Sequence, residues 1–197
     1  MKDKVRIQDQ KLLYHLTDLD NLESILKKGL MSRYELKGRF KDVADPDILE
    51  GREKYDLDKM VPFHFFAKNP FDGRVLADHP YEAFCLISVY RTFAKSKKWK
   101  IIPKHPLSKV SAFEICDYES GFEKIDWEKM NKREYSDPDC KSVCMAECLS
   151  PSTVDANDFG IIYVKSEKEH KLVTTLIKSH NLGTIVTINP KMLTIKR

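Results

Sequence analysis

The segment that most constrains the fold of this chain is an eight-residue apolar run, Ala83-Phe84-Cys85-Leu86-Ile87-Ser88-Val89-Tyr90. A run of this length without strict polar alternation is typical of a strand that other elements cover on both faces. No apolar run in the sequence approaches the roughly 18 residues that a membrane-spanning helix requires. The chain is therefore expected to fold around a buried central strand.

Shorter apolar segments on both sides of this run predict further strands. We expect them at residues 12–16, 61–67, 99–102, 110–115, 142–149, 160–164 and 183–188. The four-residue spacing of Cys140, Cys144 and Cys148 leaves a helix open as an alternative for 142–149. Helices are expected over 20–29, from 125–130 and around 172–177, with a turn at 69–73 and a loop or short helix covering a cleft at 33–59. This pattern predicts one mixed α+β domain over residues 1–197.

The helix predicted from residue 20 carries signals at both ends. Asp20 suits the N-cap position, and Glu23 completes a D-x-x-E capping box. Gly29 suits the residue that closes the helix, because glycine tolerates the backbone conformation found there. The helix therefore follows directly on the end of the first strand, where His15 and Thr17 lie.

Composition is that of an ordinary soluble globular protein. Charged residues make up 32% and hydrophobic residues 42% of the chain, and the formal net charge is +4. Basic residues gather at 95–100 and 129–133, and each group either contacts phosphates or forms a solvated face. Residues 1–6 precede no apolar signal segment, so secretion is not indicated.

The five cysteines indicate neither a disulfide framework nor a metal site. Their number is odd, no CxxC pair occurs, and no histidine lies near the cysteines at 140–148. We therefore expect buried thiols in a reducing cytoplasm and no bound metal.

Glu147 is the residue that most suggests chemistry, because it is a lone acid within Val143-Cys144-Met145-Ala146-Glu147-Cys148-Leu149. A carboxylate buried without a partner is costly, so it is either salt-bridged for structure or retained for function. In the functional case it stabilises the positive charge that develops on a sugar as an N-glycosidic bond breaks, and it can accept a proton from the nucleophile. Both alternatives stay open on these residues alone.

Residues in three other segments have a functional and a structural interpretation. His15 and Thr17, with the Leu16 backbone, could hold a ribose and a carboxamide, or His15 could be a structural hydrogen-bonding residue. Arg52, in a charge-rich segment, could clamp a pyrophosphate through two hydrogen bonds or simply be solvated. His105, within Pro103-Lys104-His105-Pro106, has the same two alternatives.

Several short stretches run in a fixed order through most of the chain. They are Tyr14-His15-Leu16-Thr17, Asn21-Leu22, Ser24-Ile25-Leu26, Gly29-Leu30-Met31-Ser32, Arg52 before Val61-Pro62-Phe63, the turn around Pro70, Ile125-Asp126-Trp127, and Asp137-Pro138-Asp139 leading to Ala146-Glu147. No single stretch is specific, but the ordered set resembles the DarT toxins, which are DNA ADP-ribosyltransferases related in fold to the diphtheria-toxin and PARP transferases. The resemblance implies an ADP-ribosyltransferase-like α+β fold with central split antiparallel β-sheets and flanking helices.

The resemblance also implies roles for the residues introduced above. Glu147 is expected to be the catalytic glutamate, placed after a substrate-recognition loop around residues 117–145. Arg52 is expected to assist proton transfer at the target base, and His105 falls where the family has a histidine implicated in activity. NAD, as the ADP-ribose donor, is expected to contact His15, Leu16, Thr17, Ser24, Ser32 and Arg52.

The implied target is a base in single-stranded DNA, because a duplex hides the reactive edges unless the base is flipped out. Trp127 and Tyr135 could stack on that base or its neighbour, although core packing is an equal alternative for Trp127. Lys132, Arg133 and Lys141 are the expected contacts to the nucleic acid.

One stretch departs from the family pattern. Where the thymidine-modifying branch has an arginine-rich run before the glutamate, this chain reads Cys140-Lys141-Ser142-Val143-Cys144-Met145, with one positive charge. The surroundings of His105 differ as well. Since the family includes a branch that modifies guanosine, the departure favours guanine slightly over thymine as the target.

The resemblance implies a toxin whose partner is an antitoxin, a macrodomain hydrolase that removes ADP-ribose from DNA. Two alternatives remain: a transferase of the same fold that acts on protein or RNA, and a catalytically silent nucleic-acid-binding module. The presence of Glu147, Arg52 and His15 argues against the silent module.

Overall fold

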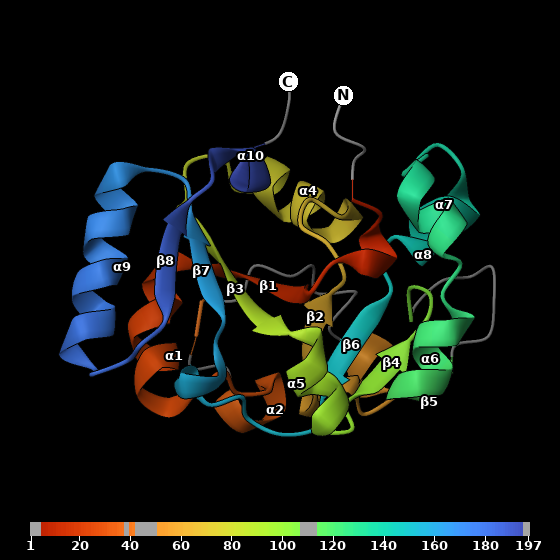
Figure 1. The fold of residues 1–197 in the computed structure, drawn as a ribbon, viewed down its shortest axis with the longest axis horizontal. Helices are drawn as coiled ribbons and strands as arrows, with labels where there is room; N and C mark the ends of the chain where they lie inside the picture. The colour runs from red at the N-terminus through yellow and green to blue at the C-terminus, as the bar shows by residue number, and fades with distance from the viewer. Residues whose placement is uncertain (1–4, 38–39, 42–50, 107–113, 195–197) are drawn as a thin grey trace.

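The computed structural model describes residues 5–37, 40–41, 51–106 and 114–194. Its centre is one eight-stranded sheet in the order β5-β4-β6-β2-β1-β3-β7-β8 (Figure 1). The strands are β1 (Leu12–Asp18), β2 (Val61–His64), β3 (Phe84–Tyr90), β4 (Lys100–Ile102), β5 (Cys116–Asp117), β6 (Glu147–Ser150), β7 (Ile161–Val164) and β8 (Ile185–Ile188). Neighbouring strands are antiparallel except β7 and β8, which are parallel.

The sheet consists of two well-paired halves with a narrow junction between them. β1 pairs with β3 along its whole length, from Leu12 to Asp18. β2 likewise pairs with β6 along its whole length, from Val61 opposite Ser150 to His64 opposite Glu147. β1 and β2, by contrast, share a single register pair, Tyr14 with His64. The split that we expected between two sheets is therefore a junction within one hydrogen-bonded sheet.

Helices lie around both halves of the sheet (Figure 1). α9 lies beyond β8 at one end of the molecule, and α6, α7 and α8 lie at the other end. The α-helices are α1 (Leu22–Lys28), α2 (Arg33–Leu36), α4 (Pro70–Asp78), α5 (Arg91–Ser96), α6 (Tyr118–Lys124), α7 (Trp127–Lys132), α8 (Pro138–Val143), α9 (Glu167–Ser179) and α10 (Pro190–Leu193). Short 3-10 helices are η1 (Ile7–Asp9), η2 (Leu19–Asn21), η3 (Leu57–Lys59) and η4 (Ala156–Asp158).

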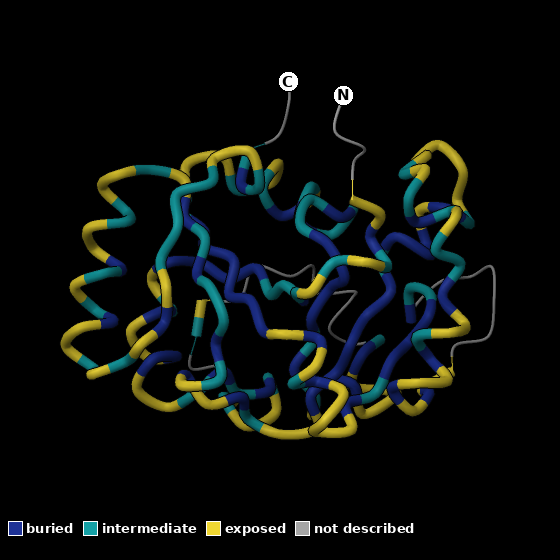
Figure 2. The backbone as a smooth tube through the Cα atoms, viewed as in Figure 1, coloured by how far each residue is buried: buried dark blue, intermediate teal, exposed yellow. Residues whose placement is uncertain are grey.

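β3 is the buried central strand that the apolar run predicted. Its residues from Phe84 to Val89 are all buried, and only Tyr90 at its end is exposed. Figure 2 shows buried backbone concentrated in the strands and exposed backbone in the surrounding helices and loops. The mixed α+β class is therefore confirmed.

The helix predicted from residue 20 is present, but its start differs. Asp18 caps a short 3-10 turn, η2, by accepting a hydrogen bond from the Asp20 backbone, and α1 begins at Leu22 without a side-chain cap. The capping box on Asp20 was therefore wrong, because the strand runs two residues further than expected. Gly29 does end α1, with φ of 86°, and a Cβ there would lie 2.9 Å from the Val154 carbonyl oxygen.

Two other local predictions were wrong for identifiable reasons. Residues 69–73 are not a free turn: Asn69 caps α4, and Pro70 occupies its first turn, where a missing N–H costs nothing. The segment 142–149 is not a single strand, because α8 extends to Val143 and β6 begins only at Glu147. Residues 110–113 of one predicted strand and much of the predicted cleft-covering segment 33–59 lie outside the described residues.

The cysteines at 85, 116, 140, 144 and 148 are all buried and unpaired. Within the described residues, no group of three or more histidine, cysteine or acidic side chains is arranged to hold a metal ion. Over the same part of the chain, none of the helices combines the length and the apolar character needed to cross a bilayer.

Candidate active site

The junction between the two halves of the sheet opens into a cavity of about 260 Å³. Its walls come from β1, α1, β2 and the start of β6, together with the segments around residues 30–33, 57–60 and 105–106. The cavity brings together every residue predicted above for NAD binding or catalysis: His15, Leu16, Thr17, Ser24, Ser32, Arg52, His105 and Glu147.

Glu147 and Arg52 form a buried ion pair on the wall of this cavity. Nη1 of Arg52 donates hydrogen bonds to both carboxylate oxygens of Glu147, at 2.8 and 3.0 Å. Nη2 of Arg52 donates to the Leu57 carbonyl oxygen at 3.5 Å. Both residues are only 5% exposed. Because a buried charge needs its partner, the arginine fixes the position of the carboxylate.

Opposing effects act on the pKa of Glu147. Burial alone raises this pKa, but the charge of Arg52 lowers it, and the charges of His64 and His105 and the hydrogen bond from Arg52 act in the same direction. The net pKa lies below the ordinary value of a glutamate, so the carboxylate is ionised at neutral pH. The ion pair does not remove Glu147 from chemistry, because the same carboxylate lines the cavity. A charge in such a water-poor site acts strongly on nearby positive charge.

His15, on β1, presents a neutral imidazole. Its Nδ1 lies 2.8 Å from the Pro62 carbonyl oxygen, which only accepts, so Nδ1 carries the proton. Burial lowers the pKa of His15 to about 4, although the hydrogen bond to Pro62 opposes the shift, and the positive charges of Arg33 and Arg52 lower it further. Nε2 is therefore a hydrogen-bond acceptor at neutral pH.

His105 reaches the cavity from the segment that follows β4. Its backbone N–H donates to the Ser142 carbonyl oxygen at 2.9 Å, which ties this segment to the C-terminal part of α8. Burial lowers the pKa of His105, and the negative charge of Glu147 opposes that shift. His105 therefore lies within electrostatic reach of the carboxylate.

His64, the last residue of β2, also lines the cavity, and no sequence pattern singled it out. It stands directly opposite Glu147 in the pairing of β2 with β6 and is 6% exposed. The sequence feature that could have pointed to His64 is its place between two phenylalanines, Phe63 and Phe65, in a predicted strand. A polar side chain in such a position requires a specific partner.

The three hydroxyl residues predicted to hold NAD differ in availability. Thr17 is buried at the end of β1, and its Oγ1 lies 3.5 Å from the Asn21 amide nitrogen. The Ser32 hydroxyl donates to the Glu35 carboxylate at 2.9 Å and accepts from the Glu35 backbone N–H at 3.3 Å, which forms the capping box of α2. Ser24 is exposed on α1. The Ser32 hydroxyl is thus engaged in structure, whereas Ser24 is accessible.

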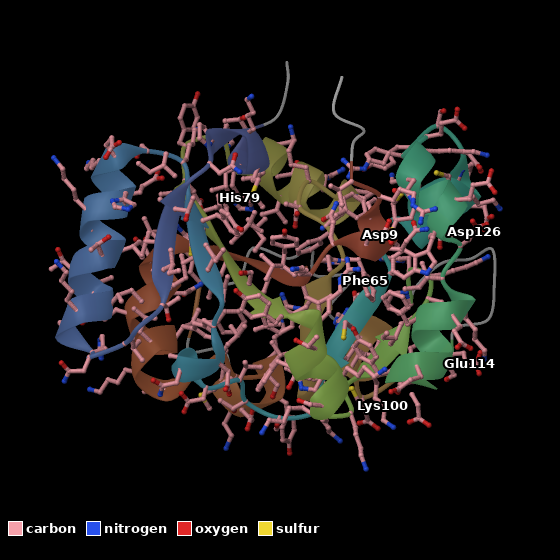
Figure 3. All side chains as sticks on the ribbon, in the orientation of Figure 1. Asp9, Phe65, His79, Lys100, Glu114 and Asp126 are labelled. Atoms are coloured by element: carbon pink, nitrogen blue, oxygen red, sulfur yellow. The ribbon has the colours of Figure 1, made fainter. Side chains whose placement is uncertain are left out.

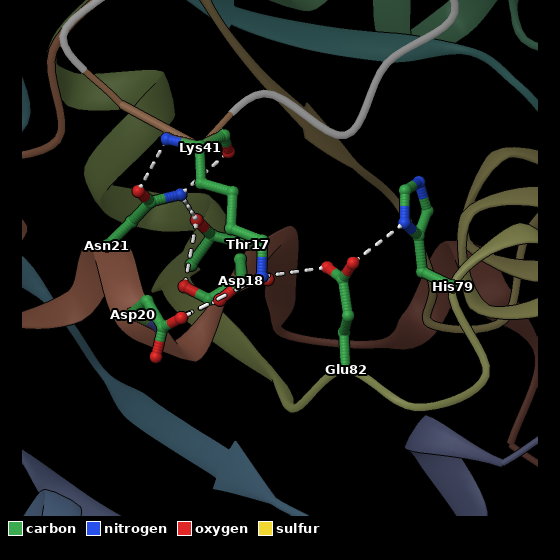
Figure 4. A network of polar contacts seen from close by, with 7 residues as sticks. All are labelled: Thr17, Asp18, Asp20, Asn21, Lys41, His79 and Glu82. Atoms are coloured by element: carbon green, nitrogen blue, oxygen red, sulfur yellow. Dashed lines mark hydrogen bonds and ion pairs between the residues drawn. The ribbon is translucent and has the colours of Figure 1, made fainter.

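A polar network lies beside the cavity where β1 ends (Figure 4). Nζ of Lys41 lies 2.8 Å from Asp18 Oδ2 and 3.0 Å from Glu82 Oε2. The Asn21 side chain also bonds both backbone groups of Lys41, each at 3.0 Å. Hydrogen bonding to Asp18 and Glu82 raises the pKa of Lys41. Since Phe40 and Lys41 both line the cavity, this network fixes part of its rim.

The five residues predicted to contact DNA are not among those lining the cavity. The Trp127 ring packs 4.6 Å from Phe122 and 5.4 Å from Phe65, centroid to centroid, and its Nε1 donates to the Phe122 carbonyl oxygen at 3.0 Å. The Arg91 guanidinium lies 5.8 Å from the same ring. Phe65 lies in the interior of the molecule (Figure 3). These contacts favour the core alternative for Trp127.

The other four lie on or close to the helices α7 and α8. Tyr135 is 38% exposed, and its hydroxyl donates to the Lys68 carbonyl oxygen at 3.4 Å. The Arg133 guanidinium lies 4.5 Å from the centroid of the Phe66 ring. Lys132 and Lys141 are exposed. Lys132, Tyr135 and Lys141 are therefore accessible, and none of the four side chains lines the cavity that holds the buried acid.

Comparison with known proteins identifies the family. The family model described as "ssDNA thymidine ADP-ribosyltransferase, DarT" matches residues 14–194. The chain belongs to the DarT family. The resemblance drawn from the ordered sequence stretches is thereby confirmed.

One curated relative is a Thermosipho africanus protein named DNA ADP-ribosyl transferase-DNA ADP-ribosyl glycohydrolase fusion protein. It is 27% identical over 191 residues, which cover 89% of this chain and 47% of the relative. The chain therefore spans about half the length of that protein.

Solved DarT structures share the fold. Thermus sp. 2.9 DarT in complex with ADP-ribosylated ssDNA superposes with a TM-score of 0.81 at 18% identity, over 93% of this chain and 96% of that one. The same Thermus protein in complex with NAD+ gives a TM-score of 0.76 at 16% identity, over 94% and 98% of the two chains. At these identities the likeness confirms the ADP-ribosyltransferase-like fold.

Proposed function

We propose that this chain transfers ADP-ribose from NAD to a thymine base in single-stranded DNA and releases nicotinamide. The observation that carries the proposal is the buried Glu147, paired with Arg52 on the wall of the cavity at the sheet junction. Membership of a family described by ssDNA thymidine modification supports the acceptor. NAD+ and ADP-ribosylated ssDNA, named for the Thermus structures, support the donor and the product.

Glu147 is the proposed catalytic residue. Transfer breaks the bond between the ribose C1′ and the nicotinamide nitrogen, and the bonding electron pair leaves with nicotinamide. Glu147 stabilises the positive charge that this loss places on the ribose, because the carboxylate is ionised and shielded from water. The bond that then forms joins C1′ to the base.

Arg52 has two proposed tasks. It holds the Glu147 carboxylate through two hydrogen bonds, and its permanent charge stabilises negative charge on the attacking base. Thymine in DNA carries one ring N–H, so attack from that nitrogen releases its proton as the new bond forms. A guanidinium favours this loss without accepting the proton itself, and the proton passes to the Glu147 carboxylate.

His15, Leu16 and Thr17 are proposed to hold the nicotinamide ribose and carboxamide of NAD from β1. The neutral His15 supplies an acceptor at Nε2, which suits a ribose hydroxyl donor. The accessible Ser24 hydroxyl adds a contact, whereas Ser32 contributes through the capping box that shapes α2. The residues present therefore fit NAD, because they offer imidazole and hydroxyl groups to its ribose and carboxamide.

DNA recognition is assigned to the region 117–145, which carries the end of β5 and the helices α6, α7 and α8. Tyr135 is the proposed stacking residue, and Lys132, Arg133 and Lys141 are proposed to contact phosphates. His105 is proposed as a further catalytic residue that lies between the base and Glu147, held there by the hydrogen bond of its backbone to Ser142 of α8. The slight preference for guanine depended only on the single positive charge in residues 140–145, before Glu147, and the family description favours thymine.

We further propose that the chain is one ADP-ribosyltransferase domain that acts as the toxin of a toxin-antitoxin pair. The Thermosipho relative, whose name joins a DNA ADP-ribosyl transferase to a DNA ADP-ribosyl glycohydrolase, supports a partner that removes the modification. A macrodomain hydrolase is the proposed antitoxin.

The test is a set of reactions with NAD and separate acceptors. Single-stranded oligonucleotides that contain only thymine or only guanine as the reactive base, an RNA and a protein mixture are analysed by mass spectrometry. We expect one ADP-ribose on the thymine oligonucleotide, and none with Glu147→Ala. Modification of only guanine, RNA or protein would contradict thymine as the acceptor. Absence of nicotinamide release with every acceptor would contradict the transferase activity.

A further inference from the structure

The position of His64 in the sheet links it to the proposed catalytic acid. His64 is paired with Glu147 across β2 and β6, and with Tyr14 across β1 and β2. The second of these is the only register pair that joins the two halves of the sheet in the described residues. His64 therefore sits between the strand that carries His15 and the strand that carries Glu147.

One hydrogen bond connects the His64 side chain to the backbone before the acid. Nδ1 of His64 lies 3.2 Å from the Ala146 carbonyl oxygen. A carbonyl oxygen only accepts, so Nδ1 is the donor. The Ala146 carbonyl belongs to the same planar peptide as the Glu147 nitrogen, and the orientation of that peptide helps to set the direction of the Glu147 side chain.

The turn before this peptide is fixed from its other side. The Ala146 N–H donates to the Val143 carbonyl oxygen at 3.0 Å, and the Met145 N–H donates to the Ser142 carbonyl oxygen at 3.1 Å. These bonds hold the segment to the end of α8. With the His64 bond to its carbonyl group, Ala146 is held through both its N–H and its C=O group.

The imidazole of His64 is itself held in place. Its ring centroid lies 5.6 Å from that of Phe71 on α4, with the planes 31° apart, and the residue is buried. The ionisable groups whose pKa responds to His64 are His15, Asp72, His105 and Glu147. The cavity that His64 lines also holds Asp20, Arg33, Lys41, Arg52 and Asp58. A side chain packed in this way can hold a backbone group at a fixed place.

We propose that His64 is a positioning residue for Glu147, acting through its hydrogen bond to the Ala146 carbonyl. The inference rests on the proposed function, because it assigns Glu147 the chemistry. Positioning within a fraction of an ångström matters for such a group, since a displacement of about 1 Å can reduce the rate by about 100-fold.

Three substitutions separate this role from others. His64→Asn keeps an amide N–H near the place of Nδ1 but cannot titrate, His64→Gln moves the N–H towards the place of Nε2, and His64→Leu removes it. We expect kcat within about 3-fold of wild type for His64→Asn, and a loss of about 10- to 100-fold for the other two. KM for NAD is expected to change little in all three.

Several outcomes would overturn the proposal. If His64→Asn loses as much kcat as His64→Leu, the hydrogen bond to Ala146 is not what matters. If all three variants equal wild type, His64 does not position the acid. A rise of KM for NAD at unchanged kcat would make His64 a binding residue. His180→Leu, at the end of α9, is the matched control and is expected to match wild type.

A crystal structure of each variant supplies a readout that needs no DNA. We expect the Glu147 carboxylate to keep its bonds to Arg52 in His64→Asn and to move in His64→Gln. An unchanged carboxylate in His64→Gln would overturn the positioning role even if no acceptor is ever modified. If wild type modifies no thymine, the proposed function fails by itself, and the crystal structures still decide the positioning role. Asparagine and glutamine are polar and no larger than histidine. His64→Asn and His64→Gln can therefore still be compared if His64→Leu does not fold.

Discussion

The ion pair between Arg52 and Glu147 predicts a large coupling in stability. Both residues are 5% exposed, and their side chains are joined by two hydrogen bonds. Loss of one member of such a pair typically costs about 3–5 kcal/mol, because the other charge is left buried. At about 2–4 °C per kcal/mol for a domain of this size, the Tm of Glu147→Leu should fall by about 6–20 °C.

Replacing both members of the pair should restore most of the stability that either single substitution removes. Arg52→Met alone leaves the carboxylate unpaired, and we expect a comparable loss. The double variant Arg52→Met with Glu147→Leu replaces the pair with apolar side chains, which is often near neutral, so most of the Tm should return. A double-mutant cycle by thermal unfolding measures the coupling directly.

The pH dependence of this stabilisation has a defined sign. The folded-state pKa of Glu147 lies below the unfolded value of about 4.3, so its contribution is present above that pH and is lost as the pH falls through the folded pKa. The Tm gap between wild type and Glu147→Leu should therefore narrow only in acid. Single variants within about 2 °C of wild type at pH 7, with no coupling in the cycle, would refute a buried pair.

Three further predictions concern residues around the cavity. The pKa of His15 is lowered to about 4, so the fold favours its neutral form and the free energy of unfolding should fall as the pH drops from about 6.5 towards 4. In urea titrations, His15→Gln should lose less of this free energy between pH 7 and pH 5 than wild type does. An equal loss in the two proteins would contradict the assignment. Lys41→Met should raise KM for NAD several-fold at near-normal kcat in steady-state assays, because the rim held by Asp18 and Glu82 is released, and an unchanged KM would exclude that role. Trp127→Ala should lower the free energy of unfolding by about 3–5 kcal/mol, measured by thermal unfolding, because its ring packs in the core. Tyr135→Ala should leave the Tm unchanged and weaken oligonucleotide binding by about 1–3 kcal/mol. The reverse pattern would contradict the core placement of Trp127.

The residues of the site could be predicted from sequence because their order along the chain is informative. Local patterns left His15, Arg52 and Glu147 with a structural alternative each, and the resemblance of the ordered stretches to the DarT family predicted them together; all three line one cavity. The strand at 83–90 was equally predictable, since an uninterrupted apolar run has few other uses.

Residues that act through register or long-range pairing were not predictable in the same way. His64 faces Glu147 only because β2 pairs with β6, and that register is not written in either segment. Lys41 meets Glu82 across a long stretch of sequence. Asn69-Pro70 was ambiguous for a different reason, because the same two residues begin turns and helices alike.

The most direct test of the central claim is nicotinamide release coupled to labelling of a thymine oligonucleotide, measured for wild type and Glu147→Gln. This substitution keeps the shape of the side chain and removes its charge. We predict that wild type adds one ADP-ribose for each nicotinamide released, and that Glu147→Gln is slower by at least about 100-fold while it still binds NAD. Comparable rates for the two proteins would contradict the assignment of the buried carboxylate to the ribose.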